Sequence, residues 1–568
     1  MSEESNASGL QSTTMIRSVT KKMFYTQVGL LILFSITIII LSSIALSILI
    51  NHINSRDADK SLDNNELLSF SNQIKIDDLI YHLKQLQIIA DQSNGTRAIG
   101  TPGFDGTLNY IIEQLEQHTN LIVRHEYFTL KNCAVQGTPQ LQSQINGFIE
   151  NHTHLIDFAH ILFTPGANFD SFVRLISIPN LGCEDSDWMN ISVTDAIVLV
   201  KRGVCTFPDK TQLAEKYRAK GLLMYNDGAA SDRFQTVRYV RSHLNATIPG
   251  YFLSYYLGMK LVNAISNSST NTSIKMIFDV SDAEIGNICA DTPTGNKAAT
   301  IVVGAHSDGV LDGSGINDNG SGSVGILVLA LNLARLFEMT SLNYAQFLYR
   351  VRFCWWGAEE VGLLGSIYHV EQASLPTATI ENGRLQDYLV YFNYDMLASP
   401  NSNFGILDSI SIPPETPNKT LPGTNRITNL FQQWFNEQKL PWTRSGIGGG
   451  SDFVPFLTGG IASGGVNTGA GGLKSATERD QYADLLGTGN SGLANVAYDS
   501  CYHQQCDRIN NVNPFAYEKV VKAAAYAIEY MGRLNDLENW LYPQGRVQNL
   551  NSFNKKHIYN IHYDSDLF

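Results

Sequence analysis

Apolar and polar residues follow distinct patterns along the chain. Residues 28–50 form an uncharged apolar run of 23 residues, and a helix of that length spans the roughly 30 Å hydrocarbon core of a bilayer. Residues 51–73 are polar and rich in Asn and Ser, which predicts a stalk. From Ile76 apolar residues recur at helical spacing, and residues 121–130 predict a strand. A folded body is therefore expected from residue 74 onward.

Residues 136–280 have a pattern of their own. The segments AIVLVKRGVCTF, KTQLAEKYRAKGLLMYNDG and TIPGYFLS predict a strand and turn, a helix and strand, and a loop. This stretch contains no cluster of the metal-ligand type. We therefore expect a β-rich inserted unit that divides the body into residues 74–135 and 281–535.

From about Ile285, predicted strands and helices alternate. ATIVVGAH, LYRVRFCWWGAEE and DYLVYFNYDML predict strands, and GSVGILVLALNLARLF predicts a helix. This alternation favours an α/β fold with a mostly parallel central sheet and helices on both faces. Residues 536–568 form a polar, aromatic C-terminal tail to which the pattern assigns no role.

The charged residues predict how the chain is oriented in a membrane, and they argue against one class of partner. The formal net charge of −13 argues against nucleic acid, because an acidic protein repels phosphate. Arg17, Lys21 and Lys22 precede the apolar run. By the positive-inside rule, residues 1–27 are then a cytosolic tail and 28–50 an uncleaved anchor of a single-pass type II membrane protein, with its body at the cell surface or in an endomembrane or vacuolar lumen. A cleaved signal peptide would give a secreted protein, but its apolar stretch is normally only about 7–15 residues.

The seven cysteines are expected to pair, with one left over, because the body leaves the reducing cytosol. We expect a disulfide between Cys501 and Cys506, which enclose Tyr502 and His503 in a short loop. We also expect Cys183 to pair with Cys205 and Cys133 to pair with Cys289. Cys354 is then the expected free thiol. Eight glycosylation sequons follow the anchor, but a chain so rich in Asn, Ser and Thr supplies many of them by chance.

Acidic residues and histidines stand where the apolar strands end. They are His306, Asp308, Asp318, Glu359, Glu360, Asp395 and His503. In open α/β sheets, sites form beyond the carboxyl ends of the strands, so these groups are expected to converge. Each signal alone has an ordinary explanation: His-x-Asp is often a capping pair, Glu-Glu is usually a solvated face, and GSGINDNGSG lacks the features of a nucleotide loop. As a set, they have no packing reason to end consecutive buried strands.

The types of these side chains indicate zinc. Imidazole and carboxylate both suit zinc, and catalytic zinc keeps a position open for water. Two histidines with only three of these five carboxylates are already too many for one tetrahedral catalytic ion. They fit two ions, about 3.5–4 Å apart, that share one bridging carboxylate.

Six segments resemble those of the co-catalytic zinc aminopeptidase family of the aminopeptidase Y type: AHSD, INDNGSG, WWGAEEVGLLGS, FNYDM, GGGSDFVPF and YDSCYHQQCD. AIVLVKRGVCTF with AKGLLMYND resembles the protease-associated domain that is commonly inserted in that family. The resemblance covers roughly residues 75–530. It implies the zinc exopeptidase fold, two zinc ions per chain, and hydrolysis of the N-terminal peptide bond of peptide substrates.

The resemblance also implies a role for each residue of the cluster. Five would be zinc ligands: His306, Asp318, Glu360, Asp395 and His503. Asp318 would bridge the two ions, and Glu359 would be the general base and acid. Asp308 would orient the imidazole of His306, and Tyr502 would help to polarise the scissile carbonyl oxygen.

Two positions depart from the pattern of the family. Ile316 stands before the Asn-Asp pair where the family usually has Ala, and Gly471 and Gly472 stand where it usually has two Glu. Loss of these acids is expected to alter the pocket wall and the substrate preference, and to leave the metal site intact.

Three other functions stay open at this point. A zinc carboxypeptidase or dipeptidase would need a basic group for a terminal carboxylate, for which Arg444 and Lys474 are candidates. A one-zinc acyltransferase of the glutaminyl cyclase type is opposed by the inserted domain and the two-metal ligand set. A catalytically inactive receptor-like ectodomain should have lost ligands, and none is lost. Four further histidines are expected to be structural: His82, His125, His160 and His369.

Overall fold

The computed structural model describes residues 70–238, 240–267, 270–338 and 344–547. The expected cytosolic tail and transmembrane anchor lie outside the described residues, as do most of the stalk and much of the C-terminal tail. Within these ranges, one helical stretch, Ile316–Glu338, is long and apolar enough to cross a membrane, and it is mostly buried inside the protein. Burial on all sides is typical of an apolar helix in a protein core.

The larger sheet is mostly parallel at its centre, as the alternation of strands and helices predicts, and it belongs to an α/β fold. Its strands lie in the order β14 (Thr443–Gly446), β13 (Gly405–Asp408), β15 (Ala462–Asn467), β12 (Tyr388–Tyr394), β10 (Asn296–His306), β11 (Tyr349–Trp356) and β9 (Thr272–Asp291). β10 pairs in parallel with both β11 and β12, and β12 pairs in parallel with β15. β9 and β13 run antiparallel to β11 and β15. The parallel centre explains the continuous apolar runs, because its strands are buried on both faces.

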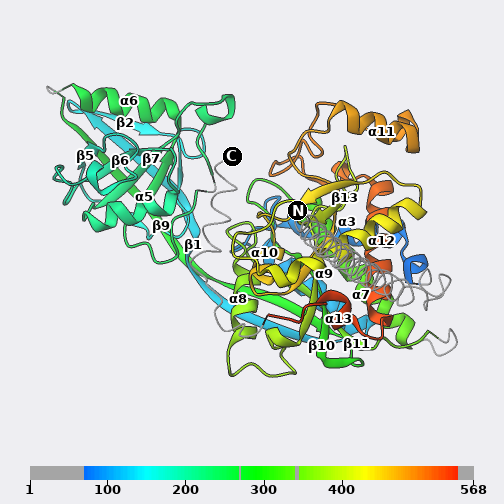
Figure 1. The fold of residues 1–568 in the computed structure, drawn as a ribbon. Coiled ribbons are helices and arrows are strands. Elements are labelled where there is room, and N and C mark those ends of the chain that lie inside the picture. The colour runs from blue at the N-terminus through cyan, green and yellow to red at the C-terminus, as the bar shows by residue number, and fades with distance from the viewer. Residues whose placement is uncertain (1–69, 239, 268–269, 339–343, 548–568) are drawn as a thin grey trace, which may run out of the picture. The chain divides into compact units, whose positions relative to one another are not determined.

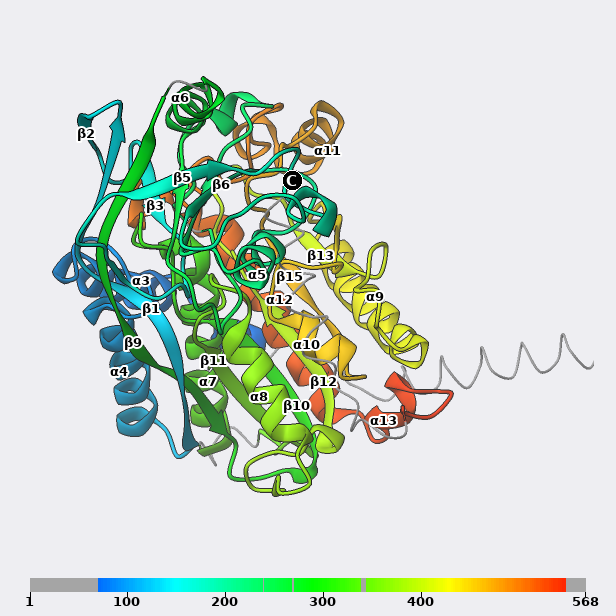
Figure 2. The same ribbon diagram turned by 90° about the vertical axis from the view of Figure 1, so that its left-hand side faces the viewer.

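Helices cover both faces of this sheet (Figure 2). α8 (Leu364–Ser374) and α10 (Phe453–Thr458) pack on one face, where they share an apolar core with side chains of β10, β11 and β12. α7 (Gly322–Glu338) packs against the same three strands from the other face, and α12 (Pro514–Arg533) packs against α7. The remaining helices of this part are α3 (Ile76–Gln92), α4 (Pro102–His118), α9 (Leu421–Glu437), α11 (Ala476–Leu486) and α13 (Leu537–Leu541).

The inserted unit is built on a second sheet, which a long ribbon joins to the first (Figure 1). The ribbon consists of β1 (Ile122–Ile145) and β9, which pair antiparallel from one end to the other. β5 to β8 pair in parallel in chain order. Apolar side chains form two clusters around this sheet, so the unit has a core of its own. The strands of the inserted unit are β2 (Phe148–His152), β3 (Phe158–His160), β4 (Ala167–Asn168), β5 (Val173–Ser177), β6 (Ile197–Lys201), β7 (Gly221–Tyr225) and β8 (Gly250–Leu253), and its helices are α5 (Phe207–Lys216) and α6 (Tyr255–Ser266).

Three disulfides lie in the described part of the chain: Cys183–Cys205, Cys289–Cys354 and Cys501–Cys506. The first and the third are expected pairs. The expected Cys133–Cys289 pair is wrong, because Cys133 is the buried free thiol and Cys354 is bonded. The reason is strand register. Cys354 lies directly opposite Cys289, whereas β1 places Arg124 opposite Cys289 and Cys133 about 30 Å further along the strand at roughly 3.4 Å per residue.

Candidate active site

The ends of three parallel strands bring the expected residues together. His306 is the last residue of β10, Asp395 directly follows β12, and Glu359 and Glu360 come shortly after β11. Because these strands are neighbours in the sheet, their carboxyl ends meet at one edge. The site therefore lies where the apolar pattern indicates.

Two groups of ligand-type atoms form at this edge, and they share Asp318. Nε2 of His306 lies 3.4 Å from Asp318 Oδ1 and 3.4 Å from Asp395 Oδ1. Nε2 of His503 lies 3.1 Å from Asp318 Oδ2 and 3.1 Å from Glu360 Oε2. Within each group, the ligand atoms all lie within 4.8 Å of one another. Asp318 thus turns one carboxylate oxygen toward each histidine.

This donor set fits metal ions. Oδ1 of Asp395 and Oε1 of Glu360 are buried and accept no hydrogen bond, an arrangement that is costly unless a cation compensates it. Burial alone would lower the pKa of His306, but Glu359 and Asp395 outweigh burial and raise that pKa well above its usual value. The site therefore attracts positive charge. Imidazole nitrogens combined with carboxylate oxygens are ligands that suit zinc.

Asp308 holds the turn that carries the two glutamates. Its carboxylate accepts the main-chain N–H groups of Glu359 (3.1 Å) and Glu360 (3.3 Å). Nδ1 of His306 lies 3.2 Å from the main-chain oxygen of Asp308 and 3.6 Å from its carboxylate. Asp308 therefore contacts the imidazole chiefly through its main chain, and its carboxylate fixes the glutamate turn.

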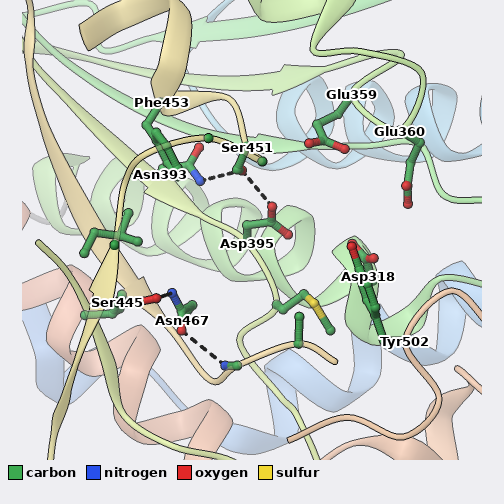
Figure 3. A pocket seen from close by; sticks show the side chains of 18 of the residues that line it. Asp318, Glu359, Glu360, Asn393, Asp395, Ser445, Ser451, Phe453, Asn467 and Tyr502 are labelled. Atoms are coloured by element: carbon green, nitrogen blue, oxygen red, sulfur yellow. Dashed lines mark hydrogen bonds between the residues drawn. The ribbon is translucent and has the colours of Figure 1, made fainter. Parts of the chain in front are cut away.

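Glu359 and Glu360 point in different directions (Figure 3). The carboxylate of Glu359 is buried, and its Oε2 lies 3.8 Å from Nε2 of His306. Burial raises the pKa of Glu359 well above its usual value, and nearby Asp452 and Glu360 raise it further. Glu359 therefore binds a proton more tightly than a solvent-exposed glutamate does, which favours a role in proton transfer.

A cavity of about 340 Å³ opens beside the two groups (Figure 3). Its lining combines the site residues with apolar and neutral polar side chains: Met396, Leu407, Phe453, Val466, Asn393, Ser445, Ser451 and Asn467. Ser451 donates to Asp395 Oδ2 (2.7 Å) and accepts from Asn393 Nδ2 (2.8 Å). No Lys or Arg is among the lining residues of the described chain. The cavity accordingly suits a neutral side chain next to a group that carries positive charge.

The loop closed by the Cys501–Cys506 disulfide carries two of the predicted residues. The ring of Tyr502 stacks on that of His503 with centroids 3.8 Å apart, and both line the cavity. Burial raises the pKa of the Tyr502 phenol well above its usual value, and the carboxylates of the site raise it further. The phenol is therefore protonated near neutral pH and can donate a hydrogen bond.

Gly469, beside the departure from the family pattern, and Gly471, at that departure, both lie close to aromatic rings. A Cβ at Gly469 would lie 2.5 Å from the ring of Tyr498, where φ is +84°. A Cβ at Gly471 would lie 3.3 Å from the ring of Tyr502. A side chain at Gly469 would thus displace Tyr498, whereas a Cβ at Gly471 would require only a small shift of Tyr502.

The two basic candidates for a carboxylate site do not line the cavity. Lys474 is buried and donates to the main-chain oxygens of Ser402 (2.7 Å) and Ser491 (3.1 Å). Arg444 lies 3.6 Å from the carboxylate of Asp408 and is largely exposed. Neither side chain is placed to bind the C-terminal carboxylate of a peptide.

The four histidines that were expected to be structural stay apart from the metal-type groups of the described chain. His82 contacts the hydroxyl of Tyr110, and His369 lies between Glu126 and Tyr388. The interpretation of these side chains as packing residues holds for both. His160 is buried in β3, and His125 stacks on Tyr127.

Three buried residues beside the site were not singled out from the sequence. Arg97 lies beneath the loop between β10 and α7. Asp452 accepts from the hydroxyl of Ser366, and Asp507 accepts the main-chain N–H groups of the Asp318 turn. Each stands in a loop with no apolar periodicity, so only the packing of distant segments reveals its place.

Comparison with known proteins identifies both parts of the chain. Residues 287–528 match peptidase family M28, and residues 171–261 match the PA domain. An aminopeptidase of Pseudomonas aeruginosa is 30% identical over 470 residues, which cover 81% of each chain. Aminopeptidase Y of Saccharomyces cerevisiae is 30% identical over 476 residues, which cover 80% of this chain and 78% of the relative.

Solved structures share the fold. The aminopeptidase from Aneurinibacillus sp. strain AM-1 superposes with a TM-score of 0.58 at 19% identity, and covers 82% of this chain and 96% of its own. The zinc aminopeptidase BSAP from Bacillus subtilis has a TM-score of 0.54 at 19% identity, and covers 80% of this chain and 95% of its own.

Proposed function

Since the chain belongs to peptidase family M28, we propose that it is an aminopeptidase that removes the N-terminal residue of peptides with the help of two zinc ions. The observation that carries the proposal is the shared carboxylate: the oxygens of Asp318 face His306 and His503, 3.4 and 3.1 Å away. A carboxylate between two ligand groups is the arrangement of a two-metal hydrolytic site.

Each zinc ion would be held by one histidine and two carboxylates. His306, Asp318 and Asp395 would hold one, and Asp318, Glu360 and His503 the other. When bound, zinc supplies Lewis-acid chemistry: it lowers the pKa of a bound water to near neutral and polarises a carbonyl group.

The remaining steps belong to side chains of the protein. Glu359 takes the proton of the attacking water and delivers it to the leaving amine. The hydroxyl of Tyr502 donates a hydrogen bond to the oxygen on which negative charge develops. Asp308 keeps Glu359 in place through its main-chain N–H.

The cavity lining favours an aminopeptidase over a carboxypeptidase. A carboxypeptidase requires a cation for the terminal carboxylate of its substrate, and no Lys or Arg is among the lining residues of the described chain. The carboxylates around the cavity instead attract a free amino group. An inactive receptor-like ectodomain is disfavoured because all five ligand side chains are present and converge.

We further propose that the body is extracytosolic and anchored by residues 28–50, with residues 136–280 as the inserted protease-associated unit. The apolar run and the preceding basic residues support the anchor. The PA domain match at residues 171–261 falls inside the proposed unit.

Hydrolysis of aminoacyl arylamides tests the activity. We expect release of the arylamine from substrates with a free amino group and a neutral side chain, and at least 100-fold slower release from the N-acetylated counterparts. Treatment with 1,10-phenanthroline should abolish hydrolysis, and zinc should restore it. Equal rates on free and blocked substrates, or full activity after verified metal removal, would contradict the proposal.

A further inference from the structure

One arginine side chain is buried beneath the glycine-rich loop of the site. Arg97 comes from the segment between α3 and α4, and it is fully buried. Its guanidinium donates to the main-chain oxygens of Ser307 (2.7 Å) and Ser314 (2.8 Å), and to that of Gly315. Carbonyl groups from both ends of one loop therefore converge on a single cation.

The glycines of this segment leave room for the guanidinium. A Cβ would lie 3.1 Å from Nη2 of Arg97 at Gly315, 3.5 Å at Gly320 and 3.7 Å at Gly309. Gly315 also has a φ of +58°, which residues with a Cβ rarely adopt. An added Cβ at Gly315 would also collide with the main-chain oxygen of Asp318, so the turn and the close approach of Arg97 together require glycine at this position.

The carboxyl group of Asp507 holds the next segment of the same loop. Asp507 accepts the main-chain N–H groups of Asn317 (2.8 Å) and Asp318 (2.9 Å). Asp507 directly follows Cys506, so the disulfide loop that carries His503 is tied to the turn that carries Asp318. The carbonyl groups of the loop face the guanidinium of Arg97, and its N–H groups face the carboxyl group of Asp507.

Arg97 is also a buried cation close to the carboxylates of the site. Burial lowers the pKa of Arg97, and Asp507, Asp308 and Asp318 counteract that effect. Buried carboxylates repel one another strongly because the surrounding dielectric constant is low. A guanidinium keeps its charge in proteins, so it reduces this repulsion whether or not a metal is bound.

We propose that Arg97 is a positioning residue of the metal centre, which holds His306 and Asp318 at the separation that binding of both zinc ions requires. Arg97 contacts no reacting atom and acts only through the loop. This inference rests on the proposed function, because it assumes that the two ligand groups bind zinc.

Zinc affinity of metal-free protein tests the inference without reference to activity. Arg97→Lys and Arg97→Met are titrated with zinc in competition with a chromophoric chelator. Arg350→Lys is the matched control, because Arg350 is equally buried and donates to Thr300 (3.0 Å) at the opposite end of β11 from the site. We expect both Arg97 variants to bind zinc 10–100-fold more weakly, the range for groups that orient metal ligands, and Arg350→Lys to bind it as the parent protein does.

A second variant covers the case in which the Arg97 variants do not fold. Thr96→Val keeps the shape of a buried side chain but removes the hydrogen bonds of Thr96 to the oxygen of Val310 (2.8 Å) and from the N–H of Ala98 (3.0 Å). It should weaken zinc binding roughly 2–10-fold, the equivalent of one net hydrogen bond. With excess zinc, the turnover of Arg97→Lys should recover while its KM stays unchanged.

Three results separate the possible failures. Unchanged zinc affinity in folded Arg97→Lys or Thr96→Val overturns the inference. An equal loss of affinity in Arg350→Lys also overturns it, because the effect would then be general destabilisation. Absence of zinc binding in the parent protein overturns the proposed function instead.

Discussion

Two consecutive glutamates after β11 have different surroundings. The Oε2 atom of Glu360 lies 3.1 Å from Nε2 of His503, whereas that of Glu359 lies 3.8 Å from Nε2 of His306. Asp308 holds the N–H groups of both. The structure thus gives a physical basis for separate roles, one glutamate in a ligand group and the other free to exchange a proton.

Substitution of each glutamate by glutamine should separate these roles. Glu359→Gln keeps the size of the side chain but removes the base, so turnover should fall by roughly 10²–10⁴-fold with an unchanged zinc content. Glu360→Gln replaces an anionic ligand by a neutral amide, so zinc should bind more weakly and added zinc should restore part of the activity. Zinc content and turnover are measured on both variants. Loss of zinc in Glu359→Gln alone would reverse the assignment.

The residues that end strands could be predicted, and those that support them could not. His306 and Asp395 stand at the ends of apolar runs, where a charged group has no packing reason. Arg97 and Asp507 lie in polar loops, where arginine and aspartate are commonplace. Their function arises from contacts with segments more than 180 residues away in sequence, which no local pattern contains.

At the scale of elements, strand order and register determine which residues face each other, and hydrophobic periodicity does not predict them. The alternation of strands and helices predicts a parallel sheet, and the centre of the larger sheet is parallel. The antiparallel position of β9 beside β11 could not be predicted, and that position places Cys289 opposite Cys354. The cysteine expectation therefore failed at the one step that depends on strand order.

The glycine loop beside the cavity supports a prediction on stability. Gly469→Ala places a Cβ 2.5 Å from the ring of Tyr498 at a φ of +84°, so it should lower the free energy of unfolding by about 1–3 kcal/mol and raise KM. Gly472→Ala is the control, because its Cβ would be at ordinary contact distance, 3.5 Å from the same ring. Urea unfolding and KM are measured on both. Equal effects of the two substitutions would mean that the loop tolerates side chains at Gly469.

The buried histidine of β3 predicts a dependence of stability on pH. Burial, and secondarily His154, lowers the pKa of His160 from 6.5 to about 4. The unfolded chain therefore binds a proton at a pH where the folded chain does not, and stability is lost as the pH falls from 6.5 toward 4. The loss from this one group should reach roughly 3 kcal/mol at most. Urea unfolding of the protein and of His160→Gln between pH 7 and 4.5 should show a smaller pH effect in the variant; an identical pH dependence would refute this assignment.

At the scale of the whole molecule, the inserted unit and the peptidase part are physically connected. β9 pairs with β11 of the larger sheet near its end and with β5 of the inserted unit near its beginning. Arg238 of the inserted unit pairs with Asp312 of the loop after β10, and Arg241 donates to the main-chain oxygen of Glu360 (3.3 Å). The inserted unit therefore contacts the segments that carry the site, although no residue of the two ligand groups belongs to it.

The proposed topology is testable on intact membranes. With tags at both ends, protease added to sealed, right-side-out vesicles should remove the C-terminal tag and spare the tag before residue 28, because the proposed topology places the N-terminus, with its basic residues, in the cytosol. Detergent, which opens the vesicles, is the control and should expose both tags. Protection of both ends would contradict the anchor, and recovery of the body in the medium would favour a cleaved signal.

The central claim is that two zinc ions share Asp318, and metal content tests it most directly. Elemental analysis of purified, active protein should give about two zinc ions per chain, by the logic of two-metal sites. Asp318→Asn should lower that number, because one carboxylate faces both histidines at 3.4 and 3.1 Å, while Asp408→Asn, outside the two ligand groups, should leave it at two. A fully active protein with one zinc ion per chain, or two ions retained at full affinity in Asp318→Asn, would contradict the account.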